Sequence, residues 1–424
     1  MVPLAAEVYL DACATSPPAP AVLAAMAAAD AEAWANPSSL HGYGLAAAER
    51  LERSRFSIAT HLGVEPDRLV FVSGGSEANH AALLGMAARM HPGRLLISSV
   101  EHPALAAAAA RLQARGWQVQ ALPVDRRGVV RLDRLEELLQ PPTRLVSVIW
   151  GQSEVGALQP IEAIGAGCRA AGVPFHTDAV QVVGHRGVDL GRLPVDLLSL
   201  TAHKLQGPRG IGALVLAPGV EIDPLIGGGG QEGGRRGGTE PVALAAGFAT
   251  ALDLAAARLH GHGGLDPLLP LRDRLLETLL RLEGVRLSGP DPADLDGRLP
   301  HHISLLVSDV AGRPLAGRDL VRALWRHGYA VSSGSACSSS VRGSSVRSRS
   351  TRTAGSGGDP RLLRPDASPV LLAMGYSPDE AASGLRLSLG PWLSQADLEG
   401  FPAALQRARA DLTAVSAGND GRAG

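Results

Sequence analysis

The run RLVSVIW, residues 144–150, is apolar almost throughout and has the length of a strand that is buried on both faces. The same pattern recurs in RLVFVSG (68–74), RLLISSV (94–100), DLLSLTA (196–202) and GALVLA (212–217). Helical stretches lie between these runs, at 104–115, 132–139 and 161–171. Buried-type strands that alternate with helices predict an α/β fold with a large, doubly wound and mostly parallel sheet. Ligands of such sheets bind at the carboxyl ends of the strands.

The pattern changes at the GHGG break, residues 261–264. Before it, a Gly-rich stretch, IGGGGQEGGRRGGTEP (226–241), reads as a loop that leads into a helix from about Val242. After it, the chain has a mixed character, with strands expected at 301–307 and 329–334 and helices at 317–327, 368–374 and 395–414. We therefore expect a large domain over 12–262 and a smaller α+β domain formed by 1–11 and 263–415.

Two segments do not fit a packed domain. Residues 341–364 hold six arginines against one acid and are otherwise rich in Ser, Gly and Thr, so we predict a disordered insertion there. Residues 416–424 are predicted to form a frayed tail.

The composition describes a globular chain with a large core. Of its 424 residues, 45% are hydrophobic and 19% are charged, and 40 basic residues balance 41 acidic ones. This balance gives no sign of direct nucleic-acid binding or of a membrane partner, so we expect a small-molecule ligand. Cys13, Cys168 and Cys337 are odd in number and far apart, which argues against a disulfide framework. No signal peptide or membrane span is evident, so we expect a cytoplasmic protein.

Lysine usage is more informative than these totals. Of the 40 basic residues, 39 are arginine and one, Lys204, is lysine. A lineage bias toward arginine explains the 39. It does not explain the exception, because arginine replaces lysine as a surface charge but cannot lose its proton or form an imine with an aldehyde. Lys204 is therefore a candidate catalytic amine.

Three motifs lie where strands are expected to end. FVSGGSEANH (71–80) places Gly75 and Ser76 at a helix start, which is typical of a phosphate site but also of an ordinary N-cap. His102, in EHP, follows the next strand, although a single histidine is often structural. Asp178 and Gln181, in FHTDAVQ, follow a strand expected at 173–176; an acid here can pair with a cationic heterocycle or cap a helix.

Three further motifs carry reactive or charged groups. Thr201 and His203 flank Lys204 in SLTAHKLQGPRG and offer phosphate ligands beside the amine. Arg386, in LRLSLG, either clamps a carboxylate or lies on an exposed edge strand. Cys337, in VSSGSACSSS, sits among small polar residues near many arginines, which favours a reactive thiolate. Cys13 and Cys168 are predicted to be packing residues.

Together these parts meet the needs of a pyridoxal-phosphate enzyme that acts on an amino acid: a phosphate site, an imine-forming lysine, an acid for the ring nitrogen and an arginine for the α-carboxylate. From about residue 9 to 412, the chain also resembles the cysteine desulfurases, within the class V aminotransferase group of fold type I. The resemblance rests on LDACATSPP, NPSSLHGYG, FVSGGSEAN, EHPAL, FHTDAVQ, AHKLQGPRGIGAL, GGGQEGGRRGGTEP, SSGSAC and RLSLG, in that order.

The resemblance implies a role for each motif residue. Lys204 is similar to the lysine that binds the cofactor and later moves the Cα proton, and Asp178 to the acid that keeps the pyridine nitrogen protonated. Gln181 matches the partner of the ring hydroxyl, and His102 the imidazole stacked on the ring. The residues that match phosphate ligands are Gly75, Ser76, Thr201 and His203, with Thr239 reaching the neighbouring subunit of a homodimer.

The resemblance also implies the chemistry. Arg386 matches the clamp for the substrate carboxylate, and Cys337 the nucleophile that takes sulfur from L-cysteine and leaves alanine. The persulfide then goes to an acceptor protein for iron–sulfur cluster assembly or thiolation.

The chain departs from the family pattern in two places. Gln152-Ser153-Glu154 replaces a frequent Asn-Asn-Glu, so Gln152 is only a weak cofactor-site candidate, and the 341–364 segment is longer than usual. A selenocysteine lyase, an aminotransferase or an inactive scaffold subunit stay open as alternatives.

Overall fold

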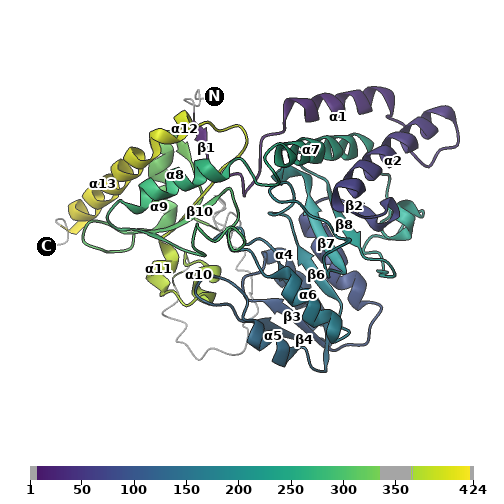
Figure 1. Ribbon diagram of the computed structural model, residues 1–424, viewed down its shortest axis with the longest axis horizontal. Helices are drawn as coiled ribbons and strands as arrows, with labels where there is room; N and C mark the ends of the chain where they lie inside the picture. Colours follow the sequence, from purple (N-terminus) through teal and green to yellow (C-terminus); the bar gives the residue numbers. More distant parts are fainter. Residues whose placement is uncertain (1–6, 335–363, 365, 421–424) are drawn as a thin grey trace.

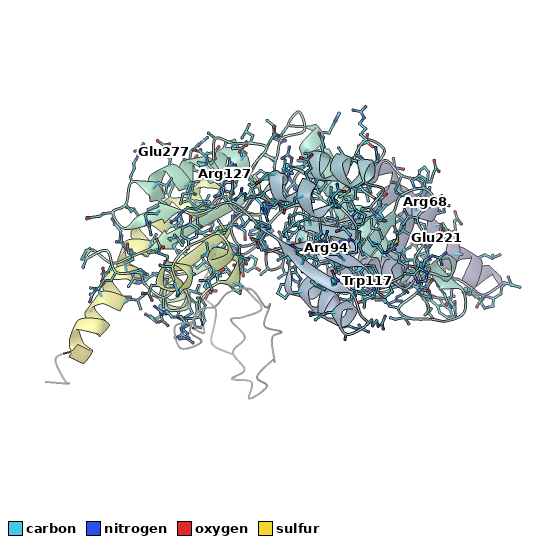
Figure 2. The ribbon with its side chains drawn as sticks, turned by 90° about the horizontal axis from the view of Figure 1, so that it is seen from below. Arg68, Arg94, Trp117, Arg127, Glu221 and Glu277 are labelled. Carbon is cyan, nitrogen blue, oxygen red and sulfur yellow. The ribbon has the colours of Figure 1, made fainter. Side chains whose placement is uncertain are left out.

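The computed structural model describes residues 7–334, 364 and 366–420, which form two bodies that lie side by side (Figure 1). The larger body is built on a seven-stranded sheet, and the smaller one on a three-stranded sheet and a two-stranded ribbon. Seen from below, Arg94 and Trp117 lie on the larger body and Glu277 on the smaller one (Figure 2).

The seven-stranded sheet has the order β2-β8-β7-β6-β5-β3-β4. Neighbouring strands pair in parallel from β7 to β4, whereas β8 pairs antiparallel with both β2 and β7. The sheet is thus mostly parallel, as the sequence predicts. Its strands are β2 (Leu69–Val72), β3 (Arg94–Ser98), β4 (Gln118–Leu122), β5 (Thr143–Ile149), β6 (Phe175–Asp178), β7 (Leu197–Thr201) and β8 (Gly212–Leu216).

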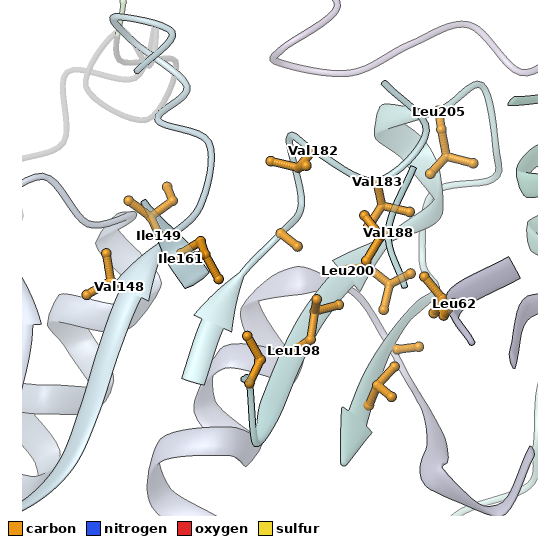
Figure 3. Close-up of a cluster of buried hydrophobic side chains, with 14 of the residues drawn as sticks. Leu62, Val148, Ile149, Ile161, Val182, Val183, Val188, Leu198, Leu200 and Leu205 are labelled. Atoms are coloured by element: carbon orange, nitrogen blue, oxygen red, sulfur yellow. The ribbon is translucent and has the colours of Figure 1, made fainter. Parts of the chain in front are cut away.

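Both faces of this sheet are buried except at the edge strand β4, which explains why the other strands are apolar runs rather than alternating ones. Successive residues point to opposite faces: Leu96 and Val146 belong to one hydrophobic cluster, and Leu95 and Leu145 to another. Figure 3 shows part of the first cluster, where side chains of β5 and β7 meet those of the segments that follow them.

Helices cover the two faces. The cluster with Leu96 includes residues of α2, α5, α6 and α7, and the cluster with Leu95 includes residues of α3 and α4. The helices of the larger body are α1 (Pro20–Glu32), α2 (Gly42–Leu62), α3 (Gly75–His80), α4 (Pro103–Gln113), α5 (Leu132–Leu138), α6 (Ile161–Ala170) and α7 (Val242–His260), with a π-helical turn at Ala81–Gly85 and 3-10 turns at Pro66–Arg68, Ala202–Lys204 and Gln231–Gly234.

Helix α7 is the one helix of the described residues that is long and apolar enough to cross a membrane by length and composition alone. It lies in the core, in contact with α1 and α2. Core helices of soluble proteins commonly have this composition, so α7 does not indicate a membrane protein.

The smaller body has its own core. Its antiparallel sheet has the order β12-β10-β9, and β1 pairs in parallel with β11. Its elements are β1 (Val8–Tyr9), α8 (Leu269–Leu280), β9 (Val285–Leu287), β10 (His302–Val307), α9 (Gly317–Arg326), β11 (Tyr329–Ala330), α10 (Pro369–Ala373), α11 (Pro378–Ala382), β12 (Gly384–Ser388), α12 (Gln395–Glu399) and α13 (Phe401–Asp420). Single bridges from Asp11 and Ser332 to β12 connect the ribbon with the sheet.

The structure confirms the α/β fold and differs from the expected elements in several details. Strand β4 was not expected, and the strand expected at 173–176 is β6, at 175–178, so Asp178 ends the strand instead of following it. The helix expected at 395–414 is broken at Gly400, a residue of low helix propensity, into α12 and α13. Helix α13 runs on through Asp420, so the stretch predicted as a tail from 416 is helical up to that residue. The strand expected at 329–334 is limited to β11. The insertion predicted at 341–364 lies, apart from Arg364, outside the described residues.

Candidate active site

Neighbouring strands of the large sheet bring the predicted residues together at one edge. Asp178 is the last residue of β6 and Thr201 the last of β7, and these strands pair directly. His102 is the N-cap of α4, four residues after β3. The carboxyl ends of parallel strands meet at the same edge of a sheet, which is where ligands of this fold class bind.

Asp178 is buried and its orientation is fixed. Its Oδ1 accepts the backbone N–H of Val180 at 3.0 Å, and its Oδ2 accepts Nδ2 of the buried Asn79 at 2.7 Å. Asn79 lies one turn into α3, and its Oδ1 has no partner among the described residues. Asn79 was not predicted; the signal that could have identified it is an amide on the buried face of the helix that begins with Gly75 and Ser76.

Lys204 lies at the end of the 3-10 turn after β7 and is half-buried. Its Nζ donates to the carbonyl oxygens of Cys13 at 2.6 Å and Ala14 at 2.8 Å. Burial lowers the pKa of this amine to about 8. A sizeable fraction is therefore neutral near physiological pH, as a nucleophilic amine requires.

The predicted phosphate ligands lie next to each other. A Cβ on Gly75 would come within 2.9 Å of Val180 Cγ2 and 3.9 Å of Thr201 Cβ, so glycine permits a close approach of α3 to the ends of β6 and β7. Ser76 is exposed, and Thr201 Oγ1 donates to the Ile211 carbonyl at 3.0 Å. His203 contacts Thr15 Oγ1 at 3.1 Å, and burial and the neighbouring Lys204 lower the pKa of its imidazole to about 4.

The Gly-rich loop is attached to this region. Arg236 Nε donates to Glu77 Oε1 at 3.0 Å, and the other oxygen of Glu77 accepts the Ser73 N–H at 2.7 Å. Despite partial burial, these hydrogen bonds hold the pKa of Glu77 below its usual range. Three residues further on, Thr239 is exposed. The loop therefore lies beside the start of α3 while Thr239 faces solvent in the single chain.

His102 and Gln181 are placed near the same centre. His102 Nδ1 accepts the Ala104 N–H at 3.1 Å; burial and the charge of Lys204 lower its pKa, although Asp178 opposes the shift. Gln181 is buried, and its Nε2 donates to the Cys13 carbonyl at 3.0 Å. Both side chains thus lie close to the lysine or to the groups that hold it.

Glu101, the residue before His102, was not predicted. Its Oε1 accepts Ser98 Oγ at 2.6 Å and the Ile149 N–H at 2.9 Å, which links the ends of β3 and β5. Burial raises its pKa to about 8, and nearby Asp178 adds to the shift. The Glu101 carboxyl group therefore connects the ends of β3 and β5 next to His102.

Gln152 is buried, but its amide is used inside its own loop. Its Oε1 accepts the N–H groups of Glu154 and Val155, at 2.5 and 2.9 Å, and its Nε2 donates to the Val100 carbonyl at 3.3 Å. These contacts stabilise the loop, and Gln152 stays a weak candidate for a cofactor contact.

Arg386, in the middle of β12, is buried and close to the N-terminal segment. Its Nη1 donates to the carbonyl oxygens of Ser153 at 3.0 Å and Gly334 at 2.8 Å, and its Nη2 to Asp11 Oδ1 at 2.6 Å. The alternative of an exposed edge-strand arginine is therefore wrong: the side chain is 3% exposed.

The cysteines divide into three cases. Cys168 is buried in the core, as predicted. The Cys13 side chain is buried too, as predicted, with its Sγ 3.4 Å from His301 Nε2; its backbone carbonyl also accepts hydrogen bonds from Lys204 and Gln181. Cys337 lies outside the described residues. Within the described part of the chain, no group of three or more His, Cys, Asp or Glu side chains is arranged to hold a metal ion.

Comparison with known proteins identifies the family of this chain. The class-V aminotransferase family model matches residues 8–399. The chain belongs to that family. It is 36% identical to the cysteine desulfurase IscS of Methanosarcina thermophila over 408 residues, which cover 95% of this chain and 93% of the relative. It is 39% identical to the IscS of Dictyoglomus turgidum over 79% of this chain and 83% of that protein.

Solved structures agree with these relatives. A NifS-like protein superposes with a TM-score of 0.80 at 29% identity, covering 96% of this chain and 99% of the other. A NifS-like protein from Rickettsia africae gives a TM-score of 0.77 at 27% identity, covering 95% and 99%. A structure of SspA in complex with cysteine gives 0.73 at 29% identity, covering 91% and 99%. The fold and the family expected from the sequence are thereby confirmed.

Proposed function

We propose that this protein is a pyridoxal-phosphate-dependent L-cysteine desulfurase, which converts L-cysteine to L-alanine and keeps the sulfur as a persulfide on Cys337. The observation that carries the proposal is Lys204: the single lysine of the chain lies at the strand ends, with a pKa lowered to about 8, beside Asp178, His102 and a buried arginine. The similarity to proteins named cysteine desulfurase supports the same reaction.

The residues present fit the cofactor. Pyridoxal phosphate, when bound, supplies an electron sink that makes the Cα proton of an amino acid acidic. Asp178 would hold the ring nitrogen, Gln181 the ring hydroxyl and His102 one face of the ring, while Lys204 would hold the aldehyde. The phosphate would lie at Gly75, Ser76, Thr201 and His203. Gly75 lets the start of α3 lie close to Val180 and Thr201, where the N–H groups of a helix N-terminus favour a phosphate.

Each protein group then has a defined task. Arg386 binds the α-carboxylate of the substrate, because a buried guanidinium pairs strongly with an anion. Lys204 would carry the Cα proton of the substrate. The Cys337 thiolate attacks the substrate sulfur, so that an S–S bond forms and the Cβ–S bond breaks; a proton at Cβ completes L-alanine.

A homodimer is part of the proposal. Large apolar side chains are exposed along α2 and the segment before it: Trp34 (68%), Leu40 (91%), Tyr43 (66%), Leu45 (57%) and Phe56 (61%). Exposed apolar patches of this kind mark interaction surfaces. The exposed Thr239 would then reach the phosphate of the second subunit. A strictly monomeric enzyme with full activity would contradict this arrangement.

One experiment tests the reaction. The holoenzyme is incubated with L-cysteine, L-alanine is quantified, and mass spectrometry locates the added sulfur. We expect alanine and a persulfide on the Cys337 peptide. An aminotransferase would instead make a keto acid without labelling Cys337, a selenocysteine lyase would release alanine only from selenocysteine, and an inactive scaffold subunit would produce neither. The sulfur acceptor, in iron–sulfur cluster assembly or thiolation, would be identified by the same label.

A further inference from the structure

The N-terminal segment 11–14 lies between the two cations of the candidate site. Lys204 Nζ donates to the carbonyl oxygens of Cys13 and Ala14, and Arg386 Nη2 donates to the carboxylate of Asp11 at 2.6 Å. The second contact is an ion pair whose side chains are 3% exposed for Arg386 and 19% exposed for Asp11. The substrate-binding arginine thus has a permanent acidic partner within its own chain.

The backbone around Asp11 is held rigidly. Asp11 forms a parallel bridge with Ser388, two residues after Arg386 on β12, and the Ser388 N–H donates to the Leu10 carbonyl at 2.8 Å. The Asp11 carbonyl also accepts the Tyr9 hydroxyl at 3.1 Å. Asp11 therefore lies beside strand β12, and its contact with Arg386 follows from the register of this bridge.

The hydrogen bonds of Arg386 show what remains available for a ligand. A guanidinium has five N–H groups. Nη1 donates to Ser153 and Gly334, and Nη2 donates once to Asp11. Nε is buried and has no partner among the described residues. Two N–H groups, on Nε and on Nη2, therefore have no described partner, and a carboxylate prefers two parallel N–H donors.

Glu154, a second acidic residue near Arg386, is less suited to be its counter-ion because its carboxyl group is more easily protonated. Glu154 accepts the Ser368 hydroxyl at 2.5 Å, and burial raises its pKa. A buried guanidinium without an anion is costly, so an ionised partner is needed whenever the substrate is absent. Asp11 meets this need and occupies one N–H of Nη2 while Nε stays free.

We propose that Asp11 is a positioning residue: its carboxylate holds Arg386 in the orientation in which the guanidinium receives the α-carboxylate of the amino-acid substrate. The inference rests on the proposed function and adds a residue to its substrate site. Asp11 contacts Arg386 directly and acts on Lys204 only through its charge, so we expect its larger effect on ligands that carry a carboxylate.

The test compares ligands with and without a carboxylate. The holoenzymes of wild type, Asp11→Ala and Asp11→Asn are titrated with L-alanine and with ethylamine, the same amine without the carboxylate, and binding is followed by the cofactor absorbance. Asp319→Asn is the matched control, since Asp319 forms an exposed ion pair with Arg322 on the same body. Cofactor occupancy and the unfolding midpoint are measured for every variant.

We expect Asp11→Ala to weaken L-alanine binding and raise the KM for L-cysteine about tenfold or more, with a much smaller change in kcat and in ethylamine binding. Asp11→Asn, whose amide oxygen still accepts one N–H, falls between wild type and alanine. Asp319→Asn matches wild type.

Two results overturn the inference while the proposed function stands: unchanged L-alanine affinity in both Asp11 variants, or an equal loss for L-alanine and ethylamine, which indicates general damage. If the alanine variant is unfolded, the asparagine variant alone decides between these outcomes. If wild type itself shows no response to L-alanine or L-cysteine, the proposed function fails, and the inference with it.

Discussion

We expect the substitution Arg55→Met to destabilise the protein strongly, because it removes the cation from a buried ion pair. Arg55 Nη1 and Nη2 donate to the two carboxylate oxygens of Glu232 at 2.8 and 2.9 Å, and Nη1 also donates to the Leu69 carbonyl at 2.7 Å. The side chains are 8% and 2% exposed. Glu232 belongs to the Gly-rich loop, so this pair joins α2 to the loop that leads to Thr239.

The size of the effect follows from what remains in the variant. Without Arg55, Glu232 keeps one described hydrogen bond, from the Phe71 N–H at 2.8 Å. Removing one partner of a buried pair costs about 3–5 kcal/mol. Glu232 also has a φ of 51°, in the left-handed region, which costs a non-glycine residue about 1–2 kcal/mol. We therefore expect the Gly-rich loop to change its conformation when the ion pair is lost. Cofactor affinity should then fall together with the free energy of unfolding.

The assay is urea unfolding of the apoprotein, followed by cofactor titration. Arg53→Met is the matched control, because Arg53 pairs with Glu49 on the same helix but both side chains are exposed, 64% and 72%. Such a pair contributes about 0–1 kcal/mol. In the double variant Arg55→Met/Glu232→Leu, part of the stability should return, since no unpaired charge stays buried. Equal losses for Arg55→Met and Arg53→Met would refute the reasoning.

Four further outcomes are expected. Lys204→Ala removes cofactor attachment and activity together, and borohydride reduction with peptide mapping places the cofactor of the wild type on Lys204; attachment at the N-terminal amine would sink this assignment. The rate at which the apoprotein captures pyridoxal phosphate rises with pH through about 8, because the lowered pKa of Lys204 leaves about a tenth of the amine neutral at pH 7, and a rate that is flat from pH 6 to 9 would contradict this. Cys337→Ser keeps the yellow cofactor and binds cysteine but releases no sulfur, and full sulfide production by it would exclude Cys337 from the reaction. Deletion of 343–362 leaves alanine release with a small reductant nearly unchanged but slows transfer to the physiological acceptor at low salt; equal transfer rates would show that the segment is a linker only.

Much of the large domain could be predicted from the sequence because its strands are buried on both faces. A short apolar run such as RLVSVIW is typical of a strand buried on both faces. The observed strand β5 lies within one residue of the expected range. The strand-end motifs were predictable for the same reason. The position at which a strand ends determines which side chains reach the shared edge of the sheet. Asp178, Thr201 and His102 lie near Lys204 because they are at or just after such strand ends.

The supporting contacts could not be predicted, because they depend on segments that are distant in the chain. Cys13 looked like a packing residue, yet its carbonyl oxygen binds Lys204 from 191 positions away. Asp11 meets Arg386 across 375 positions, through a bridge between the ribbon and β12. A hydrogen bond to a backbone carbonyl does not depend on the residue type, so the sequence cannot reveal it. The register between segments that are distant in the chain is fixed only when the whole domain is packed.

The contrast between Lys204 and the arginines indicates why one lysine remains in this chain. Arg55 and Arg386 are buried and bind several oxygens each through a planar fork, and burial does not remove their charge at neutral pH. A lysine there would supply fewer fixed donors and would tend to lose its proton. At position 204 that tendency is useful, because burial lowers the amine pKa to about 8 and makes a nucleophile available. A bias toward arginine therefore costs little wherever a cation must stay charged, and the proposed role of Lys204 explains why the bias does not extend to this position.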